Sequence, residues 1–177
     1  MGINLELKAM HWLKHERGCV IVLCERSPRE WLCGRPDVLG VMPSRYAYEV
    51  EIKRTLSDFR ADQDKRSRRL RGQHPEKFPK EFYYLVPEGL PVLAELPDWA
   101  GLLVADSLGY FYPTVIKPAP INRLSERYSL KECAKLVSLQ SNQIVATEAK
   151  CESLRAVRDE SYTPYYVNRP GYTDFQI

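Results

Sequence analysis

The chain has 177 residues, of which 44% are hydrophobic and 28% charged, and its formal net charge is +3. These are ordinary values for a globular protein with a core large enough to fold unaided. No segment reaches the roughly 20 apolar residues of a membrane-spanning helix, and none reads as a signal peptide. We therefore expect an intracellular, cytoplasmic protein without a membrane partner.

The cysteines, at positions 19, 24, 33, 133 and 151, are odd in number and include no C-x-x-C pair. This pattern disfavours both a disulfide framework and a zinc knuckle. His11 and His15 have a helical spacing that can bind zinc, but no third ligand accompanies them, so we do not expect zinc.

The first half of the chain predicts one helix followed by three strands. Apolar residues recur at helical spacing over residues 3–16, and Gly18 follows as a stop signal. The run 19–24 predicts a buried strand because it is short, apolar and rich in β-branched residues. Two further strands are predicted over 36–42 and 46–53. Three successive strands with short links favour an antiparallel meander.

The second half predicts a polar helix over 56–70, capped by Thr55 or Ser57, with strands over 81–86 and 100–105 and an edge strand over 110–117. A last helix is predicted over 129–150, where Ser129 and Glu132 form a capping box. The tyrosine-rich tail from about residue 161 could stack on unpaired bases, but such tails more often pack on their own domain or are disordered. We divide the chain into a core over 1–125 and a C-terminal helix and tail over 126–177, packed on or extending the same domain.

An acidic group with one lysine is the main candidate for chemistry. Asp37 lies on the second predicted strand, and Glu51 and Lys53 lie on the third. Side chains alternate along a strand, so Glu51 and Lys53 project from one face while Val50 and Ile52 point into the core. Two close carboxylates are stable when a cation offsets their repulsion, and Mg²⁺ prefers such oxygen ligands. Lys53 would then lie beside the metal-bound water.

The helix after this group carries further charges. Asp58, Asp62 and Lys65 share one helical face, which either looks into the active cleft or forms only a cap and an ordinary ion pair. A block of basic residues could neutralise phosphates, although the same block could be a solvated helix face. The predicted nucleic-acid contacts are Arg54, Arg60, Lys65, Arg66, Arg68, Arg69 and Arg71.

These motifs resemble a known family. A P-D on the second strand, E-x-K on the third, and a helix next are similar to the PD-(D/E)XK nuclease superfamily. The run E-I-K-R-T-L-S-D-F-R-A-D at 51–62 resembles more narrowly the MmcB-like DNA repair group, as do F-Y-Y-L-V-P at 82–87 and G-L-L-V-A-D at 101–106. The resemblance covers about residues 3 to 120.

The resemblance implies an α/β, restriction-endonuclease-like core, with a central mixed sheet of about five strands flanked by helices. It implies Asp37, Glu51 and the main-chain carbonyl of Ile52 as metal ligands, and Lys53 as the catalytic lysine. The metal would be Mg²⁺, with Mn²⁺ able to substitute. A further acidic ligand would be either Glu25 or Glu6, of which a strand-end position slightly favours Glu25.

The function we expect is a Mg-dependent deoxyribonuclease, an endonuclease rather than an exonuclease, acting in DNA repair, recombination or processing. A first alternative is a DNA-binding or recruitment protein of the same fold that does not cut. A second is an interaction subunit that forms a homodimer, or binds a partner protein, through its last helix and tail.

Overall fold

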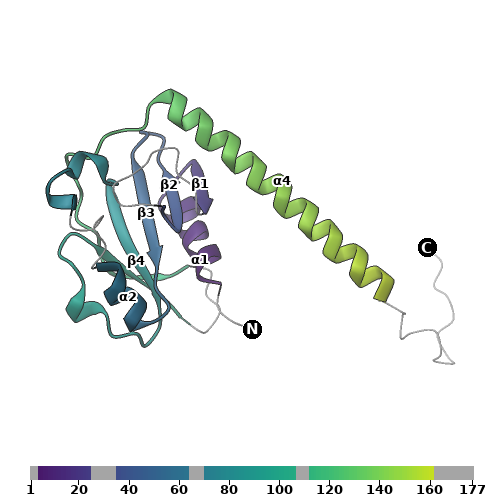
Figure 1. Cartoon of the computed structure of the whole chain (residues 1–177), viewed down its shortest axis with the longest axis horizontal. Coiled ribbons are helices and arrows are strands. Elements are labelled where there is room, and N and C mark those ends of the chain that lie inside the picture. The colour runs from purple at the N-terminus through teal and green to yellow at the C-terminus, as the bar shows by residue number, and fades with distance from the viewer. Residues whose placement is uncertain (1–3, 25–34, 64–69, 107–111, 162–177) are drawn as a thin grey trace. The chain divides into compact units, whose positions relative to one another are not determined.

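The computed structural model describes residues 4–24, 35–63, 70–106 and 112–161, with side chains of the last helix described as far as residue 152. Six strands form one mixed sheet in the order β1-β2-β3-β4-β5-β6 (Figure 1). The predicted α/β class is confirmed, and the sheet has six strands where about five were expected. The strands are β1 Ile21–Cys24, β2 Val38–Val41, β3 Ala47–Ile52, β4 Glu81–Pro87, β5 Gly101–Ala105 and β6 Thr114–Lys117.

The sheet is mixed, with antiparallel pairs towards both edges and parallel pairs in its middle. β1, β2 and β3 pair antiparallel, which confirms the predicted meander. β4 and β5 then run parallel to β3, and β6 returns antiparallel to β5. Parallel neighbours need a crossover connection, and α2, Leu56–Gln63, lies in the one between β3 and β4. This crossover starts immediately after the predicted E-x-K motif.

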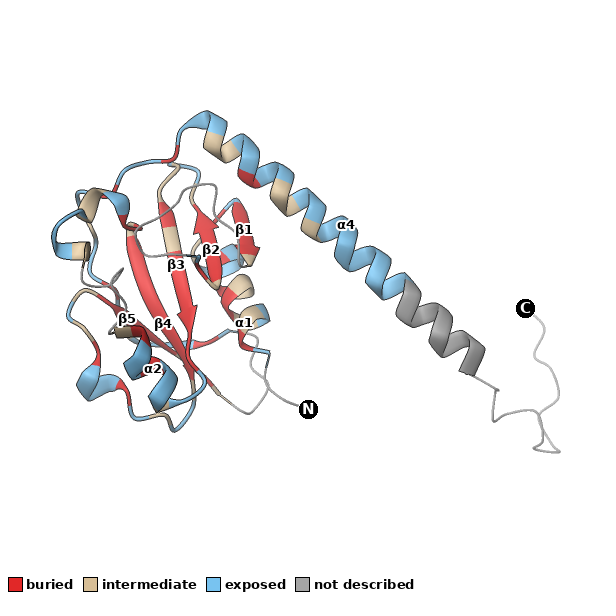
Figure 2. Cartoon of the chain, viewed as in Figure 1, coloured by how far each residue is buried: buried red, intermediate tan, exposed pale blue. Residues whose placement is uncertain are grey.

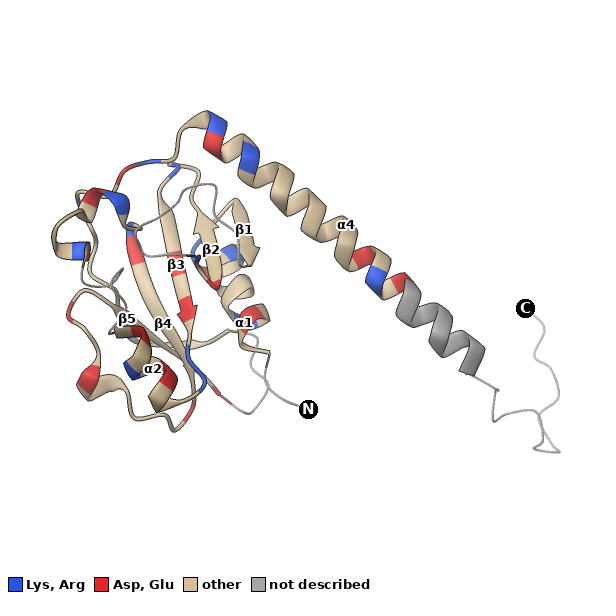
Figure 3. Cartoon of the chain, viewed as in Figure 1, with Lys and Arg blue, Asp and Glu red and all other residues tan. Residues whose placement is uncertain are grey.

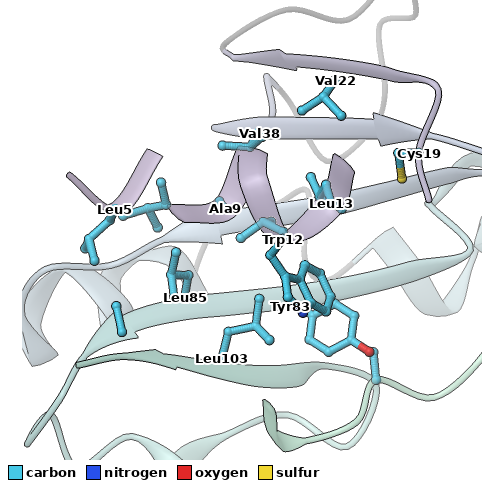
Figure 4. Close-up of a cluster of buried hydrophobic side chains, with 14 residues drawn as sticks. Leu5, Ala9, Trp12, Leu13, Cys19, Val22, Val38, Tyr83, Leu85 and Leu103 are labelled. Atoms are coloured by element: carbon cyan, nitrogen blue, oxygen red, sulfur yellow. The ribbon is translucent and has the colours of Figure 1, made fainter. Parts of the chain in front are cut away.

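The first helix covers one face of the sheet. It was predicted as one helix over 3–16, but α1, Leu5–His11, gives way to a π-helical turn, η1, Trp12–Glu16. Asn4 caps α1 by accepting a hydrogen bond from the Leu7 main-chain nitrogen. Figure 4 shows this helix and turn lying on the sheet, with Trp12 beside Tyr83 at a ring-centroid distance of 5.0 Å. The buried members of this first core cluster include Leu5, Ala9, Leu13, Val38, Val50, Leu85 and Leu103.

The other face of the sheet carries α2 and the start of α4. Phe59 of α2 packs in one cluster with Phe82 and Tyr84 of β4. The helix predicted over 56–70 is confirmed as far as Gln63, residues 64–69 lie outside the described part, and Leu70 already begins a 3-10 turn, η2, Leu70–Gly72. A second 3-10 turn, η3, Pro75–Lys77, follows. A further 3-10 turn, η4, Leu93–Glu95, precedes β5.

The last helix, α4, runs from Leu130 to Ser161 and is longer than the predicted 129–150. The predicted capping box is confirmed: the Glu132 nitrogen donates to Ser129 Oγ, and the Ser129 nitrogen donates to the Glu132 carboxylate. Leu136 is buried in a cluster with Leu39 and Tyr128, so the start of α4 packs on the sheet.

Two compact units divide the chain at residues 140 and 141. The predicted division at residue 125, between a core and a C-terminal helix with its tail, stays a prediction, and the tyrosine-rich tail lies outside the described residues. In the part of the chain that the structure describes, no helix combines the length and the apolar character needed to cross a membrane. Among the described cysteines, Cys19 is buried, Cys24 and Cys133 are half-buried, and Cys151 is exposed.

Candidate active site

The centre of the candidate site is Lys53, the residue that follows β3. Its main-chain nitrogen donates to the Leu85 carbonyl at 3.0 Å, which extends the β3–β4 pairing by one residue. Its side chain lies on the face that carries α2, where Nζ donates to Glu51 Oε1 at 2.9 Å. Both side chains are buried, with exposed fractions of 5% and 7%. The charged face of β3 is therefore covered rather than solvated, as Figure 2 shows for β3 and β4.

Helix α2 brings two more carboxylates to the same ammonium group. Thr55 fixes the start of the helix by accepting a hydrogen bond from the Asp58 nitrogen. Asp62, one turn later, places Oδ1 3.2 Å from Lys53 Nζ, and Asp58 places Oδ1 3.9 Å away. The predicted face of Asp58 and Asp62 thus points at the predicted lysine, whereas Lys65 lies outside the described residues. Figure 3 shows the acidic segments on β3 and α2.

Tyr84 is a residue of this site that sequence reasoning missed. It is fully buried on β4, next to Glu51 in the parallel register, and its hydroxyl donates to Asp62 Oδ2 at 2.9 Å. The hydrogen bond fixes the Asp62 carboxylate while its other oxygen faces Lys53. The run Phe82-Tyr83-Tyr84 reads as an apolar strand, and only the pairing of β4 with β3 reveals the role of this hydroxyl.

The charge state of Lys53 follows from these contacts. Burial alone would lower the pKa of its ammonium group, but the charges and hydrogen bonds of Glu51 and Asp62 outweigh burial. The pKa of Lys53 is therefore raised above its ordinary value, and the group is a cation at neutral pH. The site therefore contains one positive charge surrounded by the carboxylates of Glu51, Asp58 and Asp62.

Asp37 directly precedes β2, whose first residue is Val38. Its Oδ2 accepts a hydrogen bond of 2.7 Å from the main-chain nitrogen of Ile52. The register pairs Val38 with Val50, so Asp37 stands next to Glu51 across the two strands and Pro36 would follow opposite Ile52. Because β2 begins only at Val38, Pro36 does not pair with Ile52. The Asp37 side chain supplies instead the acceptor that the Ile52 N–H requires. This contact holds the carboxylate of Asp37 against the chain between Glu51 and Lys53.

The two candidates for a further acidic ligand have different outcomes. Glu6 forms an ion pair with Arg54 at 2.9 and 3.0 Å, in which both side chains are about half exposed. Glu25 lies outside the described residues. Over the ranges that the structure describes, no three His, Cys, Asp or Glu side chains gather so that they could hold a metal ion. The predicted ligand set, two carboxylates and a carbonyl, stays a prediction.

Some of the basic residues predicted to contact nucleic acid make contacts within the protein. Arg60 pairs with Glu95 on the surface, and Arg54 pairs with Glu6. Arg71 lies over the rings of Phe78 and Trp99, 5.3 and 4.8 Å from their centroids. The remaining four, Lys65, Arg66, Arg68 and Arg69, lie outside the described residues.

A second charged group, which the sequence did not suggest, lies on the opposite face. Arg17 makes two hydrogen bonds to the buried carboxylate of Glu81, at 2.7 and 2.8 Å. The hydroxyl of Tyr83 donates to the same carboxylate at 2.9 Å, and the Arg17 guanidinium stacks on Tyr48. Sixty-four residues separate Arg17 from Glu81, so no local motif could have linked them. Their mutual pairing gives this group a structural role.

Comparison with known proteins gives the fold and leaves the family open. No family model and no curated protein matches the chain. A solved structure, SPO1766, a protein of unknown function from Silicibacter pomeroyi, is similar with a TM-score of 0.50 and 24% identity. The similarity covers 93% of this chain and 98% of that one. At this identity it shows that the two proteins share a fold.

Proposed function

We propose that the protein is a metal-dependent nuclease of the PD-(D/E)XK superfamily that hydrolyses phosphodiester bonds in DNA. One observation carries the proposal: the buried ammonium group of Lys53 lies 2.9 Å from the carboxylate of Glu51 on β3. β3 pairs with β2, and Asp37 directly precedes β2. The order P-D, then E-x-K, then a helix is the one that the sequence motifs suggested. The narrower resemblance, to the MmcB-like group, suggests work in DNA repair, recombination or processing.

The donor chemistry of the site suits Mg²⁺ or Mn²⁺. The hydrogen bond from Ile52 to Asp37 brings one carboxylate against the main chain that carries the other. We propose that Asp37, Glu51 and the Ile52 carbonyl hold the ion, because carboxylate and carbonyl oxygens are the ligands that these hard cations prefer. A bound ion would lower the pKa of a bound water and offset the charge of the phosphate.

Lys53 would contribute hydrogen bonds and positive charge. Attack of water on phosphorus makes one P–O bond and breaks another, and negative charge grows on the phosphoryl oxygens meanwhile. An ammonium group fixed beside them stabilises that charge without reorganising. Asp62 and Tyr84 support this role as positioning residues, since Asp62 contacts Lys53 and Tyr84 donates a hydrogen bond to Asp62.

The phosphates of DNA would meet the basic residues around α2. The Arg54–Glu6 and Arg60–Glu95 pairs lie on the surface, and exposed ion pairs of this kind stabilise a protein by only about 0–1 kcal/mol. Both arginines could therefore exchange their carboxylates for phosphates at small cost. Lys65, Arg66, Arg68 and Arg69 complete the proposed contacts on sequence grounds.

The decisive experiment is a cleavage assay with matched variants. Labelled single-stranded, duplex and branched DNA are incubated with the full chain and Mg²⁺ or Mn²⁺. Asp37→Asn, Glu51→Gln and Lys53→Met should each lower the cleavage rate about 100-fold or more. The exposed Glu88→Gln and Lys150→Met change the same charges and should cleave like wild type. Wild-type protein as inactive as Asp37→Asn on every substrate would refute the nuclease.

A second candidate function is DNA binding or recruitment without cleavage. It is favoured by the internal contacts of the two carboxylates, since Asp37 accepts from Ile52 and Glu51 accepts from Lys53. Both contacts also make sense in a purely structural cluster. Binding of labelled DNA that weakens with salt, without any product in Mg²⁺ or Mn²⁺, would select this candidate.

A further inference from the structure

Helix α4 is longer than the core needs. Leu136 is buried with the sheet, and Cys133 and Leu139 pack beside it. From Ser141 to Glu152 every residue is exposed except the half-buried Gln143, and this stretch belongs to the second compact unit. Helical propensity alone gives a solvated helix little stability in water, so long helices usually owe their stability to packing. We therefore expect the exposed part of α4 to pack against a partner.

An apolar stripe along α4 has the seven-residue period of a coiled coil. Its members are exposed, at 75% for Leu130, 49% for Val137 and 53% for Ile144, and Cys151 follows at the same interval. This period equals 3.5 residues per turn and keeps one face turned towards a partner helix. The positions four residues after the first three members complete the seam, and they hold Ala134, Ser141 and Glu148.

We propose that this stripe pairs α4 with α4 of a second copy of the chain, in antiparallel orientation. When Ser141 is placed against Ile144 of the second copy, Ala134 falls against Cys151 and Glu148 against Val137. The first two layers each set a small side chain against a larger one, which lets the helices approach closely. Three layers on each side of the two-fold axis span most of the described helix.

Charge complementarity supports the antiparallel pair. In this register Lys131 of each copy stands opposite Glu152 of the other, at flanking positions where coiled coils carry their interhelical ion pairs. A parallel pair would instead set Glu148 directly against Glu148 of the second copy, and Lys131 would have no acidic partner. The central stretch 136–147 carries no charged residue. A second copy of this helix is thus a better partner in antiparallel than in parallel orientation.

The oligomeric state of the full chain tests the pairing. Light scattering coupled to gel filtration should give twice the 20.5 kDa of one chain. Ile144→Lys places a charge in the seam and should give a monomer whose helix content by circular dichroism is lower, because the exposed part of α4 then lacks its partner. Asn142→Lys adds the same charge at an exposed position outside the seam and should remain a dimer. A wild-type monomer at all concentrations, or a dimer that withstands Ile144→Lys, would overturn the proposal.

Cross-linking tests the orientation. Ala134→Cys should form a disulfide with Cys151 of the second copy under mild oxidation, identified by mass spectrometry of the linked peptides. Ala149→Cys, on another side of the helix, should form no such link. A dimer of wild-type protein joined through two Cys151 residues would reveal a parallel pair and contradict the register proposed here. These outcomes are independent of whether the protein cleaves DNA.

Discussion

Two aspartates on one helix lie beside the same ammonium group in very different surroundings. Asp62 is 1% exposed, 3.2 Å from Lys53 Nζ, and accepts a hydrogen bond from Tyr84. The Asp58 side chain is 52% exposed and 3.9 Å away. Removing one partner of a buried ion pair leaves an uncompensated charge, whereas an exposed partner is replaced by water. Substituting each aspartate in turn therefore compares a buried with an exposed ion pair to the same lysine.

We predict that Asp62→Asn lowers the free energy of unfolding by roughly 3 kcal/mol, because Lys53 then keeps only part of its compensation. Asp58→Asn should change it by less than about 0.5 kcal/mol. Urea denaturation followed by tryptophan fluorescence measures both. Equal losses for the two variants would mean that burial does not distinguish these carboxylates.

Tyr83 predicts a dependence of stability on alkaline pH. Burial, reinforced by the charge of Glu81 and opposed by a hydrogen bond with the Ala119 main chain, raises the pKa of Tyr83 to about 12. In the unfolded chain a tyrosine has a pKa of about 10. Between these two values the unfolded chain loses a proton that the folded chain keeps, so the free energy of unfolding falls with pH. The slope is about 1.4 kcal/mol per pH unit.

Tyr83→Phe removes this contribution, so its stability should fall less steeply above pH 10 than that of wild type. Urea denaturation at about pH 9, 10 and 11 gives the two slopes. The other titrating groups are common to both proteins and cancel in the difference. Parallel curves would show that Tyr83 does not titrate with a raised pKa.

The sequence predicted the residues of the candidate site better than their contacts. Alternation along one strand was enough to put Glu51 and Lys53 on the same face, and helical spacing was enough to join Asp58 to Asp62. Tyr84 escaped notice because its role depends on which strand lies beside β3. The pairing of Arg17 with Glu81 was not predicted for the same reason, because nothing in the sequence near either residue indicates that the fold brings them together.

At the scale of elements, strand order and close packing depend on particular small residues. Gly101 begins β5 opposite Tyr83 of β4. A Cβ atom here would overlap the Tyr83 ring and lie 2.7 Å from the main-chain nitrogen of Ala119. Neither the ring nor the backbone can withdraw easily, because Tyr83 is fixed by Trp12 and by Glu81.

We predict that Gly101→Ala lowers the free energy of unfolding by about 1–3 kcal/mol, as expected for overpacking. Gly72→Ala is the matched control, because a Cβ at Gly72 meets nothing within 4 Å. Thermal unfolding of both variants tests this, and a similar melting temperature for Gly101→Ala and wild type would contradict the clash.

Element types followed from the apolar pattern, and their ends did not. Strands were recognised because β-branched and aromatic residues occur in short runs, and the caps of α2 and α4 followed from Thr55 and Ser129. The π-helical turn after α1 keeps the apolar face of a helix, so periodicity over 3–16 could not reveal it. The end of α4 was placed too early because its exposed half has little apolar signal besides the seven-residue stripe.

The whole molecule is divided within a helix rather than at a loop. Tyr128 and Leu136 are fully buried against β1 and β2, so the chain as far as residue 140 contributes to the core of the first unit. Beyond Gln140 the described side chains of α4 belong to the second unit. The position of this division determines which truncations the fold tolerates.

We predict that a chain ending at Gln140 keeps the cooperative unfolding transition of the sheet unit, with a free energy of unfolding within about 1 kcal/mol of the Ile144→Lys monomer. A chain ending at Ser129 loses Leu136 and its neighbours from the core and should be less stable by about 2–5 kcal/mol, the range for removing a large buried side chain. Urea denaturation monitored by tryptophan fluorescence reports this unit, because Trp12 and Trp99 both lie in it. If the chain ending at Gln140 were already unfolded, the sheet would depend on residues beyond 140. If both truncated chains matched the monomer, the start of α4 would not belong to the core.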